Sequence, residues 1–154
     1  MPKQSAGLLI YRRRNDRTEV FLVHPGGPLW QNKDRGAWSI PKGEFTPPED
    51  PLDAAQRELH EETGHQVNGP FLPLEPIKQN SGKIVHAWAV AADLDADQIQ
   101  SNTFSMEWPP RSGKMQDFPE VDRAAWFDFD AAMEKIIEAQ QGLLKQLSQI
   151  LLNS

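Results

Sequence analysis

Three glutamates, Glu58, Glu61 and Glu62, stand at positions i, i+3 and i+4 and directly follow Arg57. On a helix this spacing places the three carboxylates on one surface, close enough to share a cation. Like charges at helical spacing repel each other, so the arrangement adds little stability by itself. A hard divalent metal ion prefers such oxygen ligands, and the spacing therefore predicts a metal site.

A single helix is expected to carry these glutamates. Asp50 followed by Pro51 is typical of a helix start, with an N-cap and a proline in the first turn. Gly64 is a typical stop signal, so we predict a helix over Pro51–Thr63. Its apolar residues share one face, and the carboxylates lie on the adjoining face at the border between core and solvent. A metal held at that border stays within reach of a substrate.

The remaining pattern predicts an α+β fold, an α/β/α sandwich in which helices flank a mixed sheet. Strands are expected at residues 6–11, 20–24, 38–41, 84–94 and 123–129, long loops at 25–36 and 109–122, and a helix over 130–152. At 154 residues the chain fits one domain, 1–154.

The composition restricts the function classes. A formal net charge of −6 argues against binding of extended nucleic acid through a basic surface, but leaves a small phosphorylated substrate open. The absence of cysteine excludes disulfides and thiolate chemistry and fits a cytoplasmic protein. The first residues carry an apolar run too short for a membrane span and no cleavable signal pattern, so no membrane partner is expected. The oligomeric state stays open.

The glutamates belong to a longer spaced pattern. The pattern consists, in order, of Gly43, five residues, Glu49, seven residues, Arg57-Glu58-Leu59, one residue, Glu61-Glu62, one residue and Gly64. This pattern resembles the Nudix box of hydrolases that cleave nucleoside diphosphates linked to another group. The preceding WSIPK, residues 38–42, is similar to the branch that hydrolyses diadenosine polyphosphates. His65 departs from the pattern, which usually has a bulky aliphatic residue there, and Val67 is expected to share that packing role.

The resemblance implies a Nudix pyrophosphohydrolase that depends on Mg²⁺, with Mn²⁺ as an alternative ion. The implied metal ligands are Glu58, Glu61, Glu62 and the main-chain carbonyl of Gly43, where glycine allows close approach of the backbone. The implied catalytic group is Arg57, Glu58, Glu61 and Glu120, in which Arg57 holds the loop–helix–loop by ion pairing, also with Glu49.

Family members take the general base either from the box or from a later loop. Glu61 is the candidate within the box, and Glu107 and Glu120 are the candidates in loops. We favour Glu120, because it stands in a polar loop just before the last predicted strand.

The substrate is expected to be a small nucleotide, a dinucleoside polyphosphate or a nucleoside triphosphate. Lys42, Lys83 and Arg111 are the predicted substrate-binding cations, and Trp30, Trp108 and Phe118 are candidates for stacking on a base. Two alternatives stay open: a non-catalytic Nudix-fold module for nucleotide sensing or protein interaction, and an acidic helix without metal. Oxidised triphosphates and capped RNA also remain possible substrates.

Overall fold

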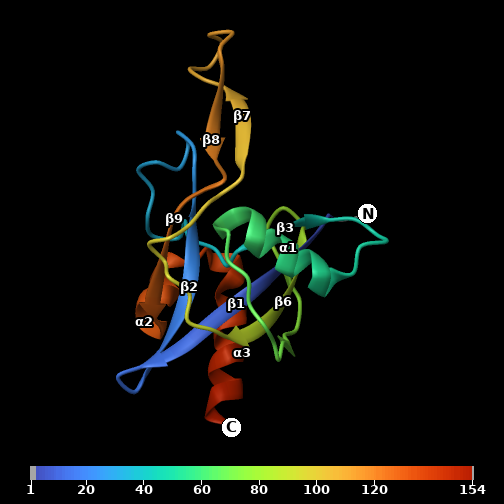
Figure 1. Ribbon diagram of the computed structural model, residues 1–154, viewed down its shortest axis with the longest axis vertical. Helices are drawn as coiled ribbons and strands as arrows, with labels where there is room; N and C mark the ends of the chain where they lie inside the picture. The colour runs from blue at the N-terminus through green and yellow to red at the C-terminus, as the bar shows by residue number, and fades with distance from the viewer. Residues whose placement is uncertain (1–2, 154) are drawn as a thin grey trace.

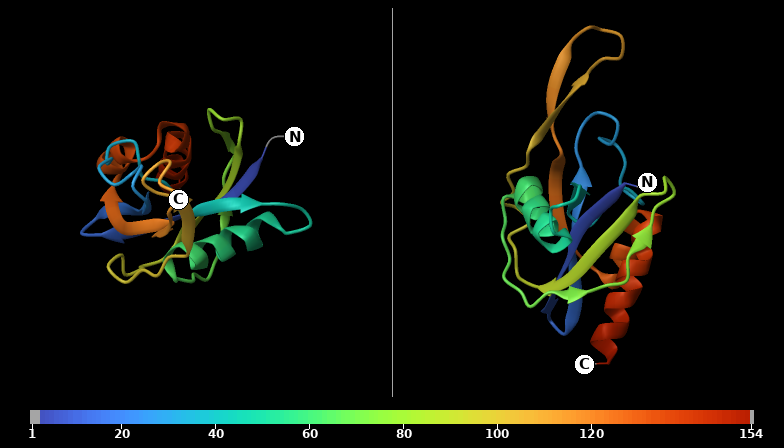
Figure 2. Two further views of the ribbon diagram at one scale, coloured as in Figure 1. Left: turned by 90° about the horizontal axis from the view of Figure 1, so that it is seen from above. Right: turned by 90° about the vertical axis from the view of Figure 1, so that its right-hand side faces the viewer.

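A mixed sheet between two helical layers forms the body of the protein in the computed structural model, which describes residues 3–153 (Figures 1 and 2). Its strands are β1 (Gln4–Arg14), β2 (Arg17–Pro25), β3 (Lys42–Phe45), β4 (Leu72–Pro73), β5 (Ile77–Lys78), β6 (Ile84–Ala91) and β9 (Val121–Asp128). They pair in the order β4-β6-β1-β2-β9, with β3 on β1 and β5 on β6. The predicted α+β class is confirmed.

The central strand β1 organises the sheet. One edge of β1 pairs in parallel with β6, and the other edge pairs antiparallel with two strands in turn. Residues 4–7 pair with β3 and residues 10–14 pair with β2. Because β2 and β3 share this edge, the sheet opens between them, and an isolated bridge from Val23 to Ser39 spans the opening.

Alternating side chains of β1 and β2 build two separate cores, one on each face of the sheet. Leu8 and Phe21 pack with the helix α1 (Pro51–Thr63) on one face. Leu9 and Leu22 pack on the other face with α2 (Phe129–Lys135) and α3 (Gln141–Leu152). Figure 2 shows α1 on one side of the sheet and the C-terminal helices on the other. The period-two alternation of buried strands therefore produces the layered sandwich.

The predicted bounds of α1 are confirmed. The Asp50 side chain accepts a hydrogen bond from the Asp53 N–H at 3.1 Å, which is the expected N-cap. Gly64 adopts a φ of 81°, and its N–H donates to the His60 carbonyl at 2.8 Å. The buried residues Ala54, Ala55 and Leu59 fix the helix on the sheet, so the direction in which the glutamates point is set by core packing.

The predicted continuous helix over 130–152 is wrong in its middle. The chain leaves α2 at Ile136, forms a 3-10 turn, η1 (Glu138–Gln140), and then begins α3. Trp38 causes the break, because its N–H donates to the Lys135 carbonyl and its own carbonyl accepts from the Ile137 N–H. Strand-like pairing with Trp38 replaces helical hydrogen bonds there, an override of local propensity by tertiary contacts.

Two further predictions need correction. The predicted loop 109–122 contains a strand, β8 (Met115–Pro119), which pairs with β7 (Thr103–Glu107) in a hairpin that extends away from the sheet (Figure 1). The predicted strand at 38–41 makes only isolated bridges, and the paired strand of that region is β3.

Within residues 3–153, no helix is both long and apolar enough to cross a membrane.

Removal of the helix cap should destabilise α1. We expect Asp50→Ala to lower the free energy of unfolding by about 1 kcal/mol, because the Asp53 N–H loses its acceptor. Chemical denaturation measures this difference. Asp97→Ala is the control, since Asp97 is also exposed but its side chain caps no helix. Equal stability of wild type and Asp50→Ala would contradict the capping role.

Candidate active site

The site is built where α1 meets β3. The Glu58 side chain leaves α1 and lies against Gly43 of β3, with only 7% of the residue exposed. A Cβ atom added at Gly43 would lie 2.0 Å from the Glu58 carboxyl carbon. Position 43 therefore has room for a glycine only, and Glu58 is held against the main chain of the loop that precedes the helix.

Arg57 connects the acidic residues of the box. Its Nε and Nη2 donate to the two carboxylate oxygens of Glu49 at 2.8 and 2.9 Å, a bidentate pair. Its Nη1 donates to Glu58 at 2.9 Å and to Glu61 at 3.0 Å. The expected ion pairing between Arg57 and Glu49 is present, and it ties the 44–50 loop to the helix.

Glu62 and Lys42 lie beside this pair. The Glu62 carboxylate accepts a hydrogen bond from the Lys42 main-chain N–H at 3.2 Å. The Lys42 side chain is largely desolvated, and this burial lowers its pKa, an effect reinforced by the nearby Lys83. Lys42 and Glu62 line the same cleft, so an amine and a carboxyl group face one cavity.

Glu120 reaches the site from the other end of the chain. The segment after α1 returns along the C-terminus of the helix, where the Asn102 N–H donates to the Glu61 carbonyl at 2.7 Å. The Asn102 carbonyl in turn accepts from the Glu120 N–H at 2.8 Å. Two backbone hydrogen bonds thus place the predicted loop carboxylate next to Glu61.

The carboxylates influence one another electrostatically. Burial, and then the charge of Glu61, raises the pKa of Glu58, and the same two causes raise the pKa of Glu120. Burial raises the pKa of Glu62 to about 8, with contributions from the charges of Glu58 and Glu120. Such clustering of desolvated acids favours a bound cation, and it is typical of functional sites.

The oxygen donors suit a hard divalent ion. Within residues 3–153, no group of three or more acidic, histidine or cysteine side chains is already arranged to hold a metal. Instead, Arg57 Nη1 bridges Glu58 and Glu61. A metal ion at these oxygens would therefore compete with Arg57 for them, whereas the bond from Arg57 to Glu49 uses other atoms of the guanidinium group.

A cavity of about 300 Å³ adjoins the carboxylates. Its polar end carries Lys42, Glu62 and Glu120, and the rest of its wall is Val23, Pro25, Trp30, Ala37, Ser39, Ile40, Gln79, Val121 and Ile137. Trp30 is 39% exposed, so its ring is available to a ligand. The arrangement joins an acidic site to an apolar cleft with one aromatic side chain.

Some predicted residues lie elsewhere. Lys83 lies near Lys42 but donates to the Glu44 carboxylate at 3.3 Å. Arg111 stands in the turn of the β7–β8 hairpin, and the structure does not bring it to the carboxylates (Figure 1). Glu107, a candidate base, caps that turn by accepting from the N–H groups of Arg111 and Gly113. Of the loop carboxylates considered, only Glu120 joins the cluster.

The other stacking candidates also lie on the hairpin. Phe118 packs with Phe104 at 6.1 Å between ring centroids, and Trp108 stands at the end of β7. His65, which departs from the box pattern, donates through Nε2 to the Asp95 main-chain carbonyl at 2.9 Å and lies edge-on to Phe21. Val67 is buried in the same core, which confirms its expected packing role.

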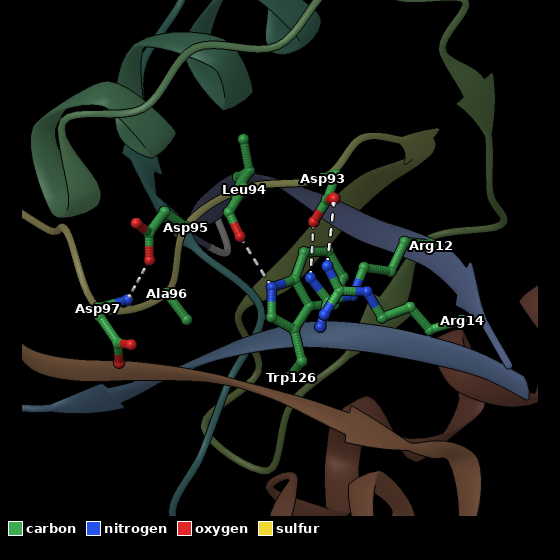
Figure 3. Close-up of a pocket in the computed structure, with 8 residues that line it drawn as sticks. All are labelled: Arg12, Arg14, Asp93, Leu94, Asp95, Ala96, Asp97 and Trp126. Carbon is green, nitrogen blue, oxygen red and sulfur yellow. Dashed lines mark hydrogen bonds and ion pairs between the residues drawn. The ribbon is translucent and has the colours of Figure 1, made fainter.

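A second pocket, shown in Figure 3, is lined by Arg12 and Arg14 and contains none of the predicted metal-ligating or catalytic residues. Arg12 donates to Asp93 at 2.6 Å, and its guanidinium carbon lies 4.1 Å from the centroid of the Trp126 ring. The Trp126 N–H donates to the Leu94 carbonyl at 2.8 Å. Because these groups satisfy each other, the pocket is explained by structural contacts.

Sequence reasoning missed several cleft residues. Val23, Ser39 and Gln79 carry no chemical signature, and only the sheet topology brings them to one cavity. It also missed the contact between His24 and Asp122, which are 98 residues apart. No local signal links such distant positions in a single sequence.

Known proteins resemble the chain over most of its length. A family model described as NUDIX domain matches residues 1–147. An 8-oxo-(d)GTP phosphatase from Mycolicibacterium smegmatis is 33% identical over 145 residues, which cover 86% of this chain and 37% of that protein. An octanoyltransferase from Myxococcus xanthus is 27% identical over 136 residues, covering 88% and 33% respectively. The chain spans about a third of the length of these curated relatives.

Solved structures share the fold. The crystal structure of a C. elegans Ap4A hydrolase binary complex superposes with a TM-score of 0.68 at 22% identity, and the alignment covers 99% of each chain. The layered sheet described above is therefore the fold of that protein.

Gly43→Ala should disrupt the site without disrupting the fold. The added methyl group must displace the Glu58 carboxylate, so we expect divalent-metal affinity to fall about tenfold or more in calorimetric titration. Gly142→Ala is the matched control, because a Cβ there would lie 3.7 Å from Ile77 at ordinary contact distance. Unchanged metal affinity in Gly43→Ala would contradict the assignment.

Glu62 should make the metal-free protein less stable at higher pH. Its folded pKa of about 8 lies above the ordinary value of 4.5, so between these values the folded state keeps a proton that the unfolded state has lost. The stabilisation that Glu62 contributes to the folded state is fully present below pH 4.5 and is lost as the pH rises through 8. We expect Glu62→Gln to reduce the fall of the melting temperature with rising pH, measured by thermal denaturation in the presence of a chelator. A parallel decline in both proteins would exclude Glu62 as its source.

Proposed function

The chain belongs to the Nudix family, and on that premise we propose that it is a metal-dependent hydrolase of a phosphoanhydride bond in a small nucleotide. The observation that carries this proposal is the packing of Glu58 on Gly43, within a cluster of desolvated carboxylates at the end of a cleft. Phosphoanhydride hydrolysis requires charge neutralisation, a positioned water and a base, and this cluster offers groups for each task.

Glu58, Glu61, Glu62 and the Gly43 carbonyl are the proposed ligands of Mg²⁺ or Mn²⁺. The bound ion supplies charge neutralisation at the phosphate oxygens. Arg57 is proposed to hold the loop and helix together through Glu49, and its bonds to Glu58 and Glu61 would give way if those oxygens held a metal ion. It thereby keeps the ligand oxygens in register.

Glu120 is the proposed general base. It lies close enough to Glu61 for their charges to interact, it lines the cleft, and it comes from a segment outside the box. The Glu120 carboxylate would take the proton of the attacking water, and the cleft would hold the rest of the substrate.

The cleft suits the organic part of the substrate. Trp30 can stack on a planar base, and Lys42 lies at the acidic end where a phosphate would enter. We propose a nucleoside triphosphate or a dinucleoside polyphosphate as substrate. The name of the mycobacterial relative adds an oxidised guanine triphosphate to the compounds to test.

A substrate panel tests this function. We expect Mg²⁺-dependent turnover of at least one of 8-oxo-dGTP, dGTP, ATP and diadenosine tetraphosphate, with AMP, ATP or pyrophosphate among the products identified by chromatography. Glu58→Gln, Glu61→Gln and Glu120→Gln should each lower kcat about 100-fold or more, because each removes a ligand or the base.

Glu75→Gln is the control for these variants, since Glu75 is exposed and its side chain lies outside the cleft. It should behave like wild type. The proposal fails if no compound is turned over with metal, or if Glu61→Gln retains wild-type activity.

A further inference from the structure

We infer that His24 is a positioning residue for substrate recognition: it fixes the segment 25–37 so that Trp30 forms one wall of the cleft. This inference rests on the proposed function, because it assigns a role in the same cleft. His24 stands at the end of β2, is 0% exposed, and has no place in the Nudix box.

The two ring nitrogens of His24 both contact acceptors. Nδ1 lies 2.8 Å from the Asp122 carboxylate, and Nε2 lies 2.6 Å from the Lys33 main-chain carbonyl. Both distances fall in the hydrogen-bond range, so each ring nitrogen has a polar partner, one on β9 and one in the loop. The buried ring thus forms a clamp between a strand and a loop.

Asp122 is aimed at His24 by an irregularity of the sheet. In the pairing of β2 with β9, His24 stands opposite Arg123, whereas Pro25 stands opposite Val121. Asp122 is therefore the additional residue of a β-bulge, a feature that redirects a side chain. Arg123, whose Nε lies 3.9 Å from Asp122, adds a positive group beside the carboxylate.

The clamped carbonyl belongs to an irregular segment that reaches the cleft. Its ends are bonded through Gly26 N–H to Glu120 O at 2.9 Å and through Gly36 N–H to Glu134 O at 3.1 Å. In its middle, the Lys33 N–H donates to the Trp30 carbonyl at 3.0 Å, and Lys33 Nζ lies 5.1 Å from the Trp30 ring centroid. The residue that His24 holds is therefore in direct contact with the aromatic wall.

The same segment has a second anchor. The Trp38 indole N–H donates to Asp34 at 2.7 Å, next to the clamped residue. Two anchors on adjacent residues, one from β2 and one from Trp38, fix the turn that carries Trp30. Removal of the His24 clamp should therefore loosen Trp30 without unfolding the segment, and this should weaken substrate binding more than the chemical step.

Steady-state kinetics of two variants, His24→Asn and Asp122→Ala, test the inference with the best substrate of the panel. Asp122 is partly exposed, so its variant remains informative if His24→Asn does not fold. We expect KM to rise about tenfold or more, with kcat within about twofold, as for the loss of an anchoring bond to a charged group. Asp117→Ala, an aspartate bonded to Ser105 on the hairpin, is the matched control and should leave both constants unchanged.

A double-mutant cycle separates positioning from general loss of structure. If the clamp acts through Trp30, Asp122→Ala should change kcat/KM by less than about twofold in a Trp30→Ala background. The inference would be overturned if the two substitutions multiplied their separate effects on kcat/KM in the double variant. It would also be overturned if kcat fell while KM stayed unchanged.

Hydrogen exchange measured by mass spectrometry gives a readout that needs no substrate. Asp122→Ala should raise exchange in the segment 25–37 and leave α1 as in wild type. Absence of turnover in the wild-type protein would reject the proposed function, while the exchange result would still decide whether the clamp holds the loop. Unchanged exchange in that segment would overturn the inference even in an active enzyme.

Discussion

The site depends on one close contact, the seating of the Glu58 carboxylate on the main chain of Gly43. Leu59 and its apolar neighbours fix α1 on the sheet, so the preceding residue must point toward β3. Only a residue without a side chain at position 43 leaves room for it. Core packing and the absence of one Cβ atom therefore determine together where the acidic group lies.

This placement concentrates negative charge, and the structure compensates for it with few cations. Arg57 contacts three carboxylates at once, and the desolvated Lys42 lies beside Glu62. Burial, together with the charges of neighbouring glutamates, raises the pKa values of Glu58, Glu62 and Glu120, so the charged form of each carboxylate is disfavoured. A site of this kind is prepared for a cation at a cost to its own stability.

Much of the site could be predicted from the sequence because its signals are local. The helix bounds, the N-cap at Asp50 and the spacing of the glutamates all lie within the range of a few turns. Glu120 could be proposed, but its approach to Glu61 depends on main-chain hydrogen bonds of Asn102 that no sequence pattern predicts. The break in the C-terminal helix was missed because long-range pairing with Trp38 decides it, and β8 was missed because its polar residues are typical of a loop.

The break between α2 and α3 connects the two faces of the molecule. Ile137 at the break lines the cleft, and Gln140 accepts a hydrogen bond from Ile40 N–H, another cleft residue, at 3.0 Å. Glu58, Glu61 and Glu62 come from α1 on one side of the sheet, whereas Ile137, part of the cleft wall, comes from the opposite layer. One cavity is thus lined by residues of both helical layers, so a substitution in the C-terminal layer can alter the shape of the cleft without touching the glutamates of α1.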